Sequence, residues 1–196
     1  MQKDVKVKSV CLNATEIERA TVRMAHQIVE ANEGVKDVCI VGIVTRGDVL
    51  AKRIVDAIEK IEGVRLPLGK LDISFYRDDY GTHFSPTVHS TEIPFSIDNK
   101  HVVLVDDVFF TGRTIRAALD ALRDIGRPAT VQLAVLVDRG HRQLPIRADY
   151  VGKNIPSSIT ENVRAYLEEV DGFSEVQVQE LADGSRIGSA PLGKED

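Results

Sequence analysis

Two adjacent carboxylates at the end of an apolar run are the residues of this sequence best suited to chemistry. Asp106 and Asp107 directly follow the run from Val102 to Val105. Four aliphatic residues in succession are typical of a central parallel strand that is covered on both faces. Open α/β sheets bind ligands at the carboxyl ends of such strands. There the two carboxylates could accept hydrogen bonds from neighbouring hydroxyl groups, directly or through a divalent ion, so the pair predicts a diol site.

A hydroxyl-rich turn follows the two carboxylates. The turn, Thr111-Gly112-Arg113-Thr114, leads into a segment whose apolar residues have helical spacing, namely Ile115, Ala118, Leu119 and Leu122. The first N–H groups of a helix and the positive end of its dipole form a ready anion site. A diol site beside a phosphate site predicts a ribose 5-phosphate ligand. The competing interpretation is an acidic turn in which a threonine caps the helix.

The run from Val102 to Thr114 resembles, end to end, the 5-phosphoribosyl-1-pyrophosphate (PRPP) motif of type I phosphoribosyltransferases. From about Asn13 to Gly172 the chain is similar to the pyrimidine operon regulators of that family, which are also uracil phosphoribosyltransferases. The resemblance includes the segments 71–79, 126–128, 132–142 and 144–156. It implies that PRPP contacts Val102, Val103, Leu104, Val105, Asp106, Asp107, Val108, Phe109, Phe110, Thr111, Gly112, Arg113 and Thr114.

The resemblance also implies where the pyrophosphate of PRPP binds. Thr45, Arg46 and Gly47 follow an apolar run and form the pyrophosphate loop, to which Arg77 is added. The implied catalytic residues are Asp106, Asp107 and Arg77. Mg²⁺ enters with PRPP, and the protein supplies no direct metal ligand beyond the two aspartates. Read without the resemblance, the loop could be a plain turn.

The spacing of two glycines tests a different phosphate site. Gly42 and Gly47 are separated as in a P-loop, but Asp48-Val49 stands where that loop needs Lys followed by Ser or Thr. The P-loop interpretation is therefore excluded.

Only the resemblance indicates which base accepts the phosphoribosyl group. Related hypoxanthine-guanine enzymes have a carboxylate immediately before the phosphate-loop threonine, and Phe110 stands there in this chain. Loss of that purine contact favours a smaller base, uracil. Pyrimidine regulators of the family usually have Tyr at this position, so one hydroxyl is absent. The implied base-binding residues are Val137, Asp138, Arg139, Arg147 and Lys153.

The resemblance further implies an mRNA partner. The regulators bind a leader RNA hairpin through a basic concave face of a dimer and respond to UMP or UTP, which controls transcription by attenuation. The residues implied for RNA binding are Arg19, Arg23, Arg142, Arg147 and Lys153. The family usually has Thr at Val22 and often Arg at Ile159. The alternatives are a salvage phosphoribosyltransferase without an RNA role and a catalytically silent PRPP-binding protein.

Strands and helices alternate along the chain, which predicts a parallel α/β sheet with right-handed crossovers. The resemblance implies the type I phosphoribosyltransferase fold, a parallel twisted sheet flanked by helices with a small hood. One domain is expected over residues 1–180, with the hood built from the N-terminal segment and about 155–180, and a flexible tail over 181–196. The expected helices are Thr15–Asn32, capped by Thr15, and Val49–Ile61. The expected strands are 38–44, 66–75, 130–137, 149–151, 163–170 and 175–179, and the polar stretch 80–92 is expected to be a lid over PRPP.

The bulk composition excludes several classes of protein. The chain has 196 residues, a formal net charge of -5 and two cysteines, Cys11 and Cys39, that are far apart. A disulfide framework and a zinc site are therefore not expected, and the negative charge argues against indiscriminate nucleic-acid binding. No apolar run is long enough to span a membrane, and the chain begins without a signal peptide. We expect a cytoplasmic protein that forms a homodimer or homohexamer.

Overall fold

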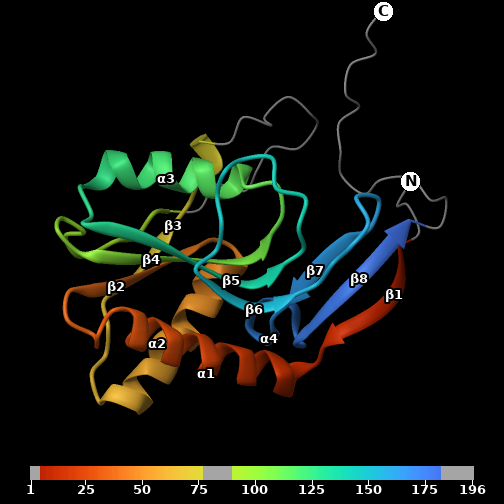
Figure 1. The fold of residues 1–196 in the computed structure, drawn as a ribbon, viewed down its shortest axis with the longest axis horizontal. Helices are drawn as coiled ribbons and strands as arrows, with labels where there is room; N and C mark the ends of the chain where they lie inside the picture. Colours follow the sequence, from red (N-terminus) through yellow and green to blue (C-terminus); the bar gives the residue numbers. More distant parts are fainter. Residues whose placement is uncertain (1–4, 77–89, 182–196) are drawn as a thin grey trace, which may run out of the picture.

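Five apolar segments form a parallel sheet with strand order β3-β2-β4-β5-β6 (Figure 1). The computed structural model describes residues 5–76 and 90–181. The strands are β2 (Val38–Ile43), β3 (Leu68–Leu71), β4 (His101–Phe109), β5 (Thr130–Asp138) and β6 (Tyr150–Asn154). This arrangement confirms the predicted parallel α/β fold.

Helices cover both faces of the sheet, which explains the uninterrupted apolar runs. On one face lie α1 (Ala14–Ala31) and α2 (Arg46–Glu62), and on the other lies α3 (Arg113–Ile125) (Figure 1). Along β4, Val103 and Val105 pack into the core under α1 and α2, whereas Val102 and Leu104 pack into the core under α3. A strand buried on both faces has no polar side, so its sequence shows no alternation.

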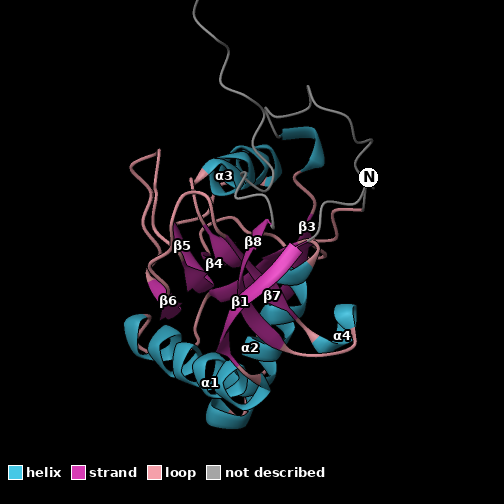
Figure 2. Cartoon of the chain, turned by 90° about the vertical axis from the view of Figure 1, so that its right-hand side faces the viewer, coloured by secondary structure: helices cyan, strands magenta, loops and turns pink. Residues whose placement is uncertain are grey.

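A second, smaller sheet joins the two ends of the described chain. Its strands are β1 (Val5–Leu12), β8 (Glu175–Leu181) and β7 (Asn162–Tyr166), paired antiparallel in that order. A short helix, α4 (Glu168–Asp171), connects β7 to β8. Viewed from the hood side, Figure 2 shows this sheet in front of the parallel sheet. It is the hood that the resemblance implied. The predicted tail, apart from Leu181, and most of the predicted lid lie outside the described residues.

Several predicted bounds were wrong for local reasons. The strand predicted over 66–75 is limited to β3, because the Asp72 carboxylate accepts the Ser74 N–H at 2.7 Å and hydroxyl at 2.6 Å and turns the chain into a 3₁₀ helix, η1 (Ser74–Tyr76). The strand predicted over 163–170 ends at Tyr166, where the chain turns towards α4. Leu119 of α3 is exposed rather than in the core.

The cap of the first helix lies two residues before the predicted one. Asn13 Oδ1 accepts the N–H of Glu16 at 3.0 Å, and the Glu16 side chain accepts the N–H of Asn13 at 2.9 Å. This reciprocal pair is a capping box, which satisfies two donors at the helix start. Thr15, the predicted cap, lies inside the first turn and is exposed. The prediction was wrong because Asn and Thr are both good caps and the spacing of the apolar residues fits either start.

Replacing Asn13 should therefore weaken the fold more than replacing Thr15. We expect Asn13→Ala to lower the free energy of unfolding by about 1 kcal/mol, because the Glu16 N–H loses its acceptor. Thr15→Ala should change it by no more than about 0.5 kcal/mol, as for most exposed positions. Urea unfolding of the two variants and the parent protein measures both. The reverse order of effects would return the cap to Thr15.

Candidate active site

The two carboxylates lie where β4 extends beyond its neighbour β2. Residues His101–Val105 of β4 pair with β2, but Asp106 pairs only with β5, opposite Val135. The strand continues to Phe109, beyond the two carboxylates at which it was predicted to end. Asp106 is 7% exposed. Its carboxylate accepts the N–H of Asp107 at 3.0 Å, and the carboxylate of Asp107 accepts the N–H of Val108 at 2.8 Å. The carboxylates are therefore fixed at the carboxyl edge of the sheet, as predicted.

Two glycines bring the start of α2 against this edge. A Cβ on Gly47 would lie 2.5 Å from the carbonyl oxygen of Val105 and 3.1 Å from the Cα of Asp106. A Cβ on Gly42 would lie 2.4 Å from the Cα of Asp48. No side chain fits either position, so the spacing that resembled a P-loop serves close backbone packing. The predicted helix start at Val49 was wrong: α2 begins at Arg46, which places the predicted pyrophosphate loop at a helix N-terminus.

Arg46 is held by Asp171 of the hood helix α4. Its guanidinium donates from Nε to Oδ2 of Asp171 at 3.0 Å and from Nη2 to Oδ1 at 2.6 Å. The hydrogen bond with Asp171 raises the pKa of Arg46, burial lowers it, and the charges of Asp171 and Asp107 raise it further. Burial raises the pKa of the Asp107 carboxyl, and the N–H of Val108 and the charge of Arg46 act in the opposite direction. The charges of Asp107 and Arg46 thus influence each other at the sheet edge.

The predicted phosphate turn is supported from the loop after β5. Gly112 has a φ of +92° and is the N-cap of α3. The carbonyl of Thr111 accepts the N–H of Gln143 at 3.0 Å, and Nε of Arg113 donates to Oε1 of Gln143 at 3.3 Å. These contacts fix the turn ahead of α3, whose first N–H groups have no intrahelical partner. The arrangement can bind an anion at the same edge as Asp106 and Asp107.

The predicted base-binding residues fall into two groups. Val137, Asp138 and Arg139 end β5 and are buried, whereas Arg147 and Lys153 are exposed. The guanidinium of Arg139 lies 4.1 Å from the ring centroid of Phe110 and donates to Ser157 Oγ and to the carbonyls of Ser158 and Glu161. The backbone N–H of Arg139 donates to the Phe109 carbonyl. Arg139 therefore joins Phe110 to the segment 157–161.

The predicted RNA-binding residues also divide. Arg19 and Arg23 are exposed on α1, and Arg23 donates to the Gly152 carbonyl of β6. Lys153 of β6 donates to the Cys11 carbonyl at 2.9 Å, so these three cations come from adjoining elements. Arg142 instead forms an ion pair at 2.7 Å with the buried Asp138.

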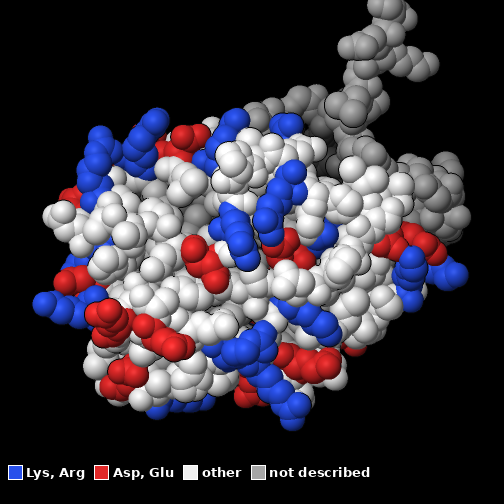
Figure 3. Space-filling view, viewed as in Figure 1, with Lys and Arg blue, Asp and Glu red and all other residues white. Residues whose placement is uncertain are grey.

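The surface carries charges of both signs. In the view of Figure 3, Lys and Arg are interspersed with Asp and Glu. No described helix is long and apolar enough to cross a membrane. Within residues 5–76 and 90–181, no group of three or more His, Cys, Asp or Glu could hold a metal ion by itself.

Sequence reasoning missed Asp171. It stands in the run Leu167-Glu-Glu-Val-Asp171, where four of the five positions were assigned to a strand and no contact with Arg46 was foreseen. An acidic residue 125 positions from its partner carries no local signal. Arg77, predicted to be catalytic, lies outside the described residues.

Comparisons with known proteins agree with this geometry. The family described as "Phosphoribosyl transferase domain" matches residues 11–169. A protein of Caldicellulosiruptor bescii named "Bifunctional protein PyrR" is 58% identical over 87% of this chain and 94% of its own. A protein of Roseiflexus sp. with the same name is 62% identical over 82% of this chain and 88% of its own.

Solved structures show the same fold at low identity. A hypoxanthine phosphoribosyltransferase from Staphylococcus aureus superposes with a TM-score of 0.66 and 22% identity, covering 89% of this chain and 93% of that one. The hypoxanthine phosphoribosyltransferase of Trypanosoma cruzi gives 0.67 and 18%, covering 89% and 98%. At these identities the likeness shows the fold alone.

The environment of Asp107 predicts how it affects stability with pH. A carboxyl whose pKa is raised on folding contributes stability below its ordinary pKa of 3.8 and loses that contribution as pH rises through its folded pKa. Asp107→Asn removes this loss and keeps the acceptor for the Val108 N–H. We expect its Tm at neutral pH to equal or exceed that of the parent, by about 2–4 °C for each kcal/mol gained.

Glu169 provides a control of opposite sign. Its hydrogen bond with Arg53 lowers its pKa, so its contribution is present at neutral pH and is lost as pH falls through its folded pKa. Thermal unfolding from about pH 4 to pH 7 should therefore show Glu169→Gln losing stability at neutral pH while Asp107→Asn does not. A lower Tm for Asp107→Asn at pH 7 would contradict the assignment.

Proposed function

Because the chain belongs to the phosphoribosyltransferase family and is similar to members named bifunctional protein PyrR, we propose that it has two activities. It transfers the phosphoribosyl group of PRPP to uracil, giving UMP and pyrophosphate, and it binds a leader mRNA hairpin to control pyrimidine genes. One observation carries the first activity. The Asp106–Asp107 pair, the N-terminus of α2 and the N-terminus of α3 meet at the carboxyl edge of one parallel sheet.

The reaction needs electrostatic stabilisation more than a nucleophile. The C1–pyrophosphate bond breaks as the C1–N bond to the base forms, so the sugar becomes cationic while the leaving group gains negative charge. Groups that stabilise both charges lower the barrier because they bind the transition state more tightly than the substrates. Asp106 and Asp107 hold the ribose hydroxyls next to the developing positive charge. The 5-phosphate binds at the turn from Thr111 to Thr114.

Pyrophosphate leaves towards the start of α2. Thr45, Arg46 and Gly47 bind it through the N–H groups of the first turn and the Arg46 guanidinium, which suits phosphate oxygens. Arg77 is proposed to contribute from the segment after η1. The helix dipole and one cation together favour the leaving group over the neutral base.

Mg²⁺ fits this site as an ion shared with the substrate. Two carboxylates at one strand end are oxygen donors of the kind that Mg²⁺ prefers, but they are too few for a protein-only cage, and PRPP oxygens would complete the shell. When bound, the ion offsets charge on the pyrophosphate. Asp106 and Asp107 are the residues that would hold it.

The base site favours uracil. Phe110 places an apolar ring, covered by Arg139, where the purine enzymes have a carboxylate. His141 packs edge-on against the same ring at 6.0 Å between centroids. Without a carboxylate at this position a purine has no partner for its ring nitrogen, whereas a smaller base needs none. Backbone groups of Val137 to Arg139 and the side chains of Arg147 and Lys153 are the proposed contacts.

An assay with PRPP, Mg²⁺ and four bases tests the enzymatic proposal. Turnover should be fastest with uracil and at least about tenfold slower with hypoxanthine, guanine or orotate, since a mismatched polar contact costs about 1.4 kcal/mol or more. Faster turnover of a purine would show that the base pocket is assigned wrongly.

The double variant Asp106→Asn, Asp107→Asn tests the proposed ribose site. It keeps the shape and the backbone hydrogen bonds of the site and removes both charges. Its turnover should fall by about 10²-fold or more, in line with losing groups that act on the transition state. Unchanged turnover in this variant would reject the ribose site.

The RNA-binding proposal is supported by three cations on adjoining elements. Arg19 and Arg23 on α1 and Lys153 on β6 are exposed to solvent. Arg147 is exposed in the loop before β6, whereas Arg142 already neutralises the buried Asp138 and contributes less to an RNA surface. Phosphates of a structured RNA can bind such a surface even on a protein of net negative charge. Val22 of α1 and Ile159, which precedes β7, are both exposed and stand where the resemblance implies polar residues.

Salt titration tests the RNA proposal. Affinity for a hairpin from the organism's own pyrimidine-gene leader should rise with UMP and fall linearly in a log–log plot against salt. Arg23→Ala should reduce the slope by about one unit, because one phosphate contact is lost. Arg142→Ala should change the slope less, because its charge is taken up by Asp138. Absence of binding at low salt with UMP, with phosphoribosyl transfer intact, would favour the salvage-enzyme alternative.

A further inference from the structure

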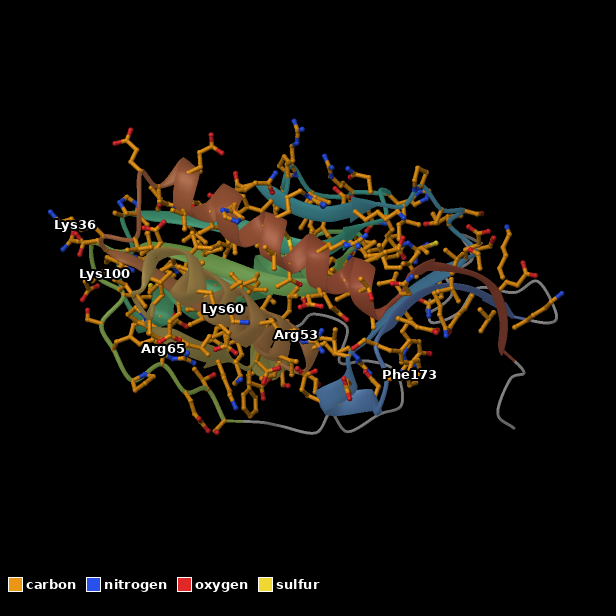
Figure 4. The ribbon with its side chains drawn as sticks, turned by 90° about the horizontal axis from the view of Figure 1, so that it is seen from below. Lys36, Arg53, Lys60, Arg65, Lys100 and Phe173 are labelled. Carbon is orange, nitrogen blue, oxygen red and sulfur yellow. The ribbon has the colours of Figure 1, made fainter. Side chains whose placement is uncertain are left out.

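Two arginines of α2 are tied to the hood helix in the same way. Arg46 and Arg53 are seven residues apart, about two turns, and so lie on the same side of α2. Arg46 forms its bidentate pair with Asp171, and Arg53 forms one with Glu169, from Nε at 2.9 Å and from Nη2 at 2.5 Å. Figure 4 shows Arg53 on the side of α2 that faces the hood, with Phe173 beyond it. Only the first pair reaches the proposed pyrophosphate site.

We propose that Asp171 is a positioning residue that orients the Arg46 guanidinium for the leaving pyrophosphate, an inference that rests on the proposed function. The carboxylate is well placed for this task because it is itself fixed. Its Oδ2 also accepts the N–H of Leu167 at 2.9 Å, and its backbone N–H donates to the Leu167 carbonyl at 2.7 Å. Its side chain is 12% exposed, against 20% for Arg46.

The pair leaves Arg46 free to bind a second anion. A guanidinium has five N–H donors in a rigid plane. The contact with Asp171 uses the Nε edge and one hydrogen of Nη2, and no other described residue takes a hydrogen bond from Nη1, so that end can bind phosphate oxygens without breaking the pair. A bidentate contact fixes the plane of the guanidinium as well as its position. Asp171 thus sets the direction of the remaining donors.

The opposite role, competition, predicts an effect of opposite sign. If Asp171 merely withheld Arg46 from the ligand, removing its charge would strengthen pyrophosphate binding. Simple electrostatics gives the same sign, because one negative charge near an anion site disappears. Positioning is the only one of these roles in which the neutral variant binds pyrophosphate more weakly.

Calorimetric titration with magnesium pyrophosphate in the presence of UMP separates these roles. We expect Asp171→Asn to weaken pyrophosphate binding about fivefold to tenfold, the range for one typical hydrogen bond, because the Arg46 contact is misoriented and its charge remains. UMP affinity should fall less, because the turn from Thr111 to Thr114 is untouched. Asp171→Glu keeps the negative charge on a longer side chain. Its pyrophosphate affinity should lie between those of the parent protein and Asp171→Asn. Unchanged or stronger pyrophosphate binding in Asp171→Asn overturns the proposal.

Glu169→Gln is the matched control for hood attachment. It removes an equivalent pair between the same two helices, and Arg53 lies outside the proposed site. Pyrophosphate affinity should stay within about twofold, as expected for a residue without ligand contact. An equal loss in Glu169→Gln and Asp171→Asn would mean that the pairs only anchor the hood.

A double-mutant cycle shows whether Asp171 acts through Arg46. In an Arg46→Gln background, Asp171→Asn should have no further effect on pyrophosphate affinity, since coupled residues do not add. A full additional loss would contradict positioning. If Asp171→Asn does not fold, as judged by its Tm and UMP binding, Asp171→Glu carries the same test in both backgrounds. Failure of the parent protein to bind UMP or pyrophosphate would reject the proposed function itself, whereas normal parent binding with an unaffected Asp171→Asn rejects only this inference.

Discussion

Close contact between the backbone of α2 and the end of β4 is the constraint on which the site depends. Only glycine fits at positions 42 and 47, because a Cβ at either position would lie within 2.5 Å of backbone atoms. The contact sets the first turn of α2 beside Asp106, so the donors of a helix N-terminus lie next to the carboxylates that we propose to bind the ribose. A larger residue at either glycine would push these two parts of the site away from each other.

Three carboxylates lie at the carboxyl edge of the parallel sheet, where burial alone would disfavour their charged forms. Asp106, Asp107 and Asp138 all lie near strand ends with limited access to water. Each is stabilised locally: Asp106 and Asp107 accept backbone N–H groups, and Asp138 accepts the Gly140 N–H at 2.9 Å and pairs with Arg142. Buried charges of this kind require partners: for Asp106 and Asp107 they come from the backbone of β4 itself, and for Asp138 from the loop after β5.

The hood extends this network across the chain. Its helix α4 supplies the carboxylates for Arg46 and Arg53, and its β7 supplies Tyr166, which stacks on Phe173 with ring centroids 4.8 Å apart. Segments more than 110 residues apart therefore set the position of the proposed pyrophosphate-binding arginine. Direct contacts therefore join the start of α2 to the hood.

The sequence by itself determined the parallel sheet, the position of the paired carboxylates and the phosphate turn. These are local features: apolar runs without alternation, two acidic residues after one of them, and a glycine with hydroxyl neighbours before a helix. The family resemblance added the ligands. Three features were decided by the tertiary structure alone. They are the acidic partner of Arg46, the close backbone packing at Gly42 and Gly47, and the ion pair of Arg142 with Asp138. Those contacts join distant segments or depend on backbone distances between packed elements, and neither leaves a periodic pattern in the sequence.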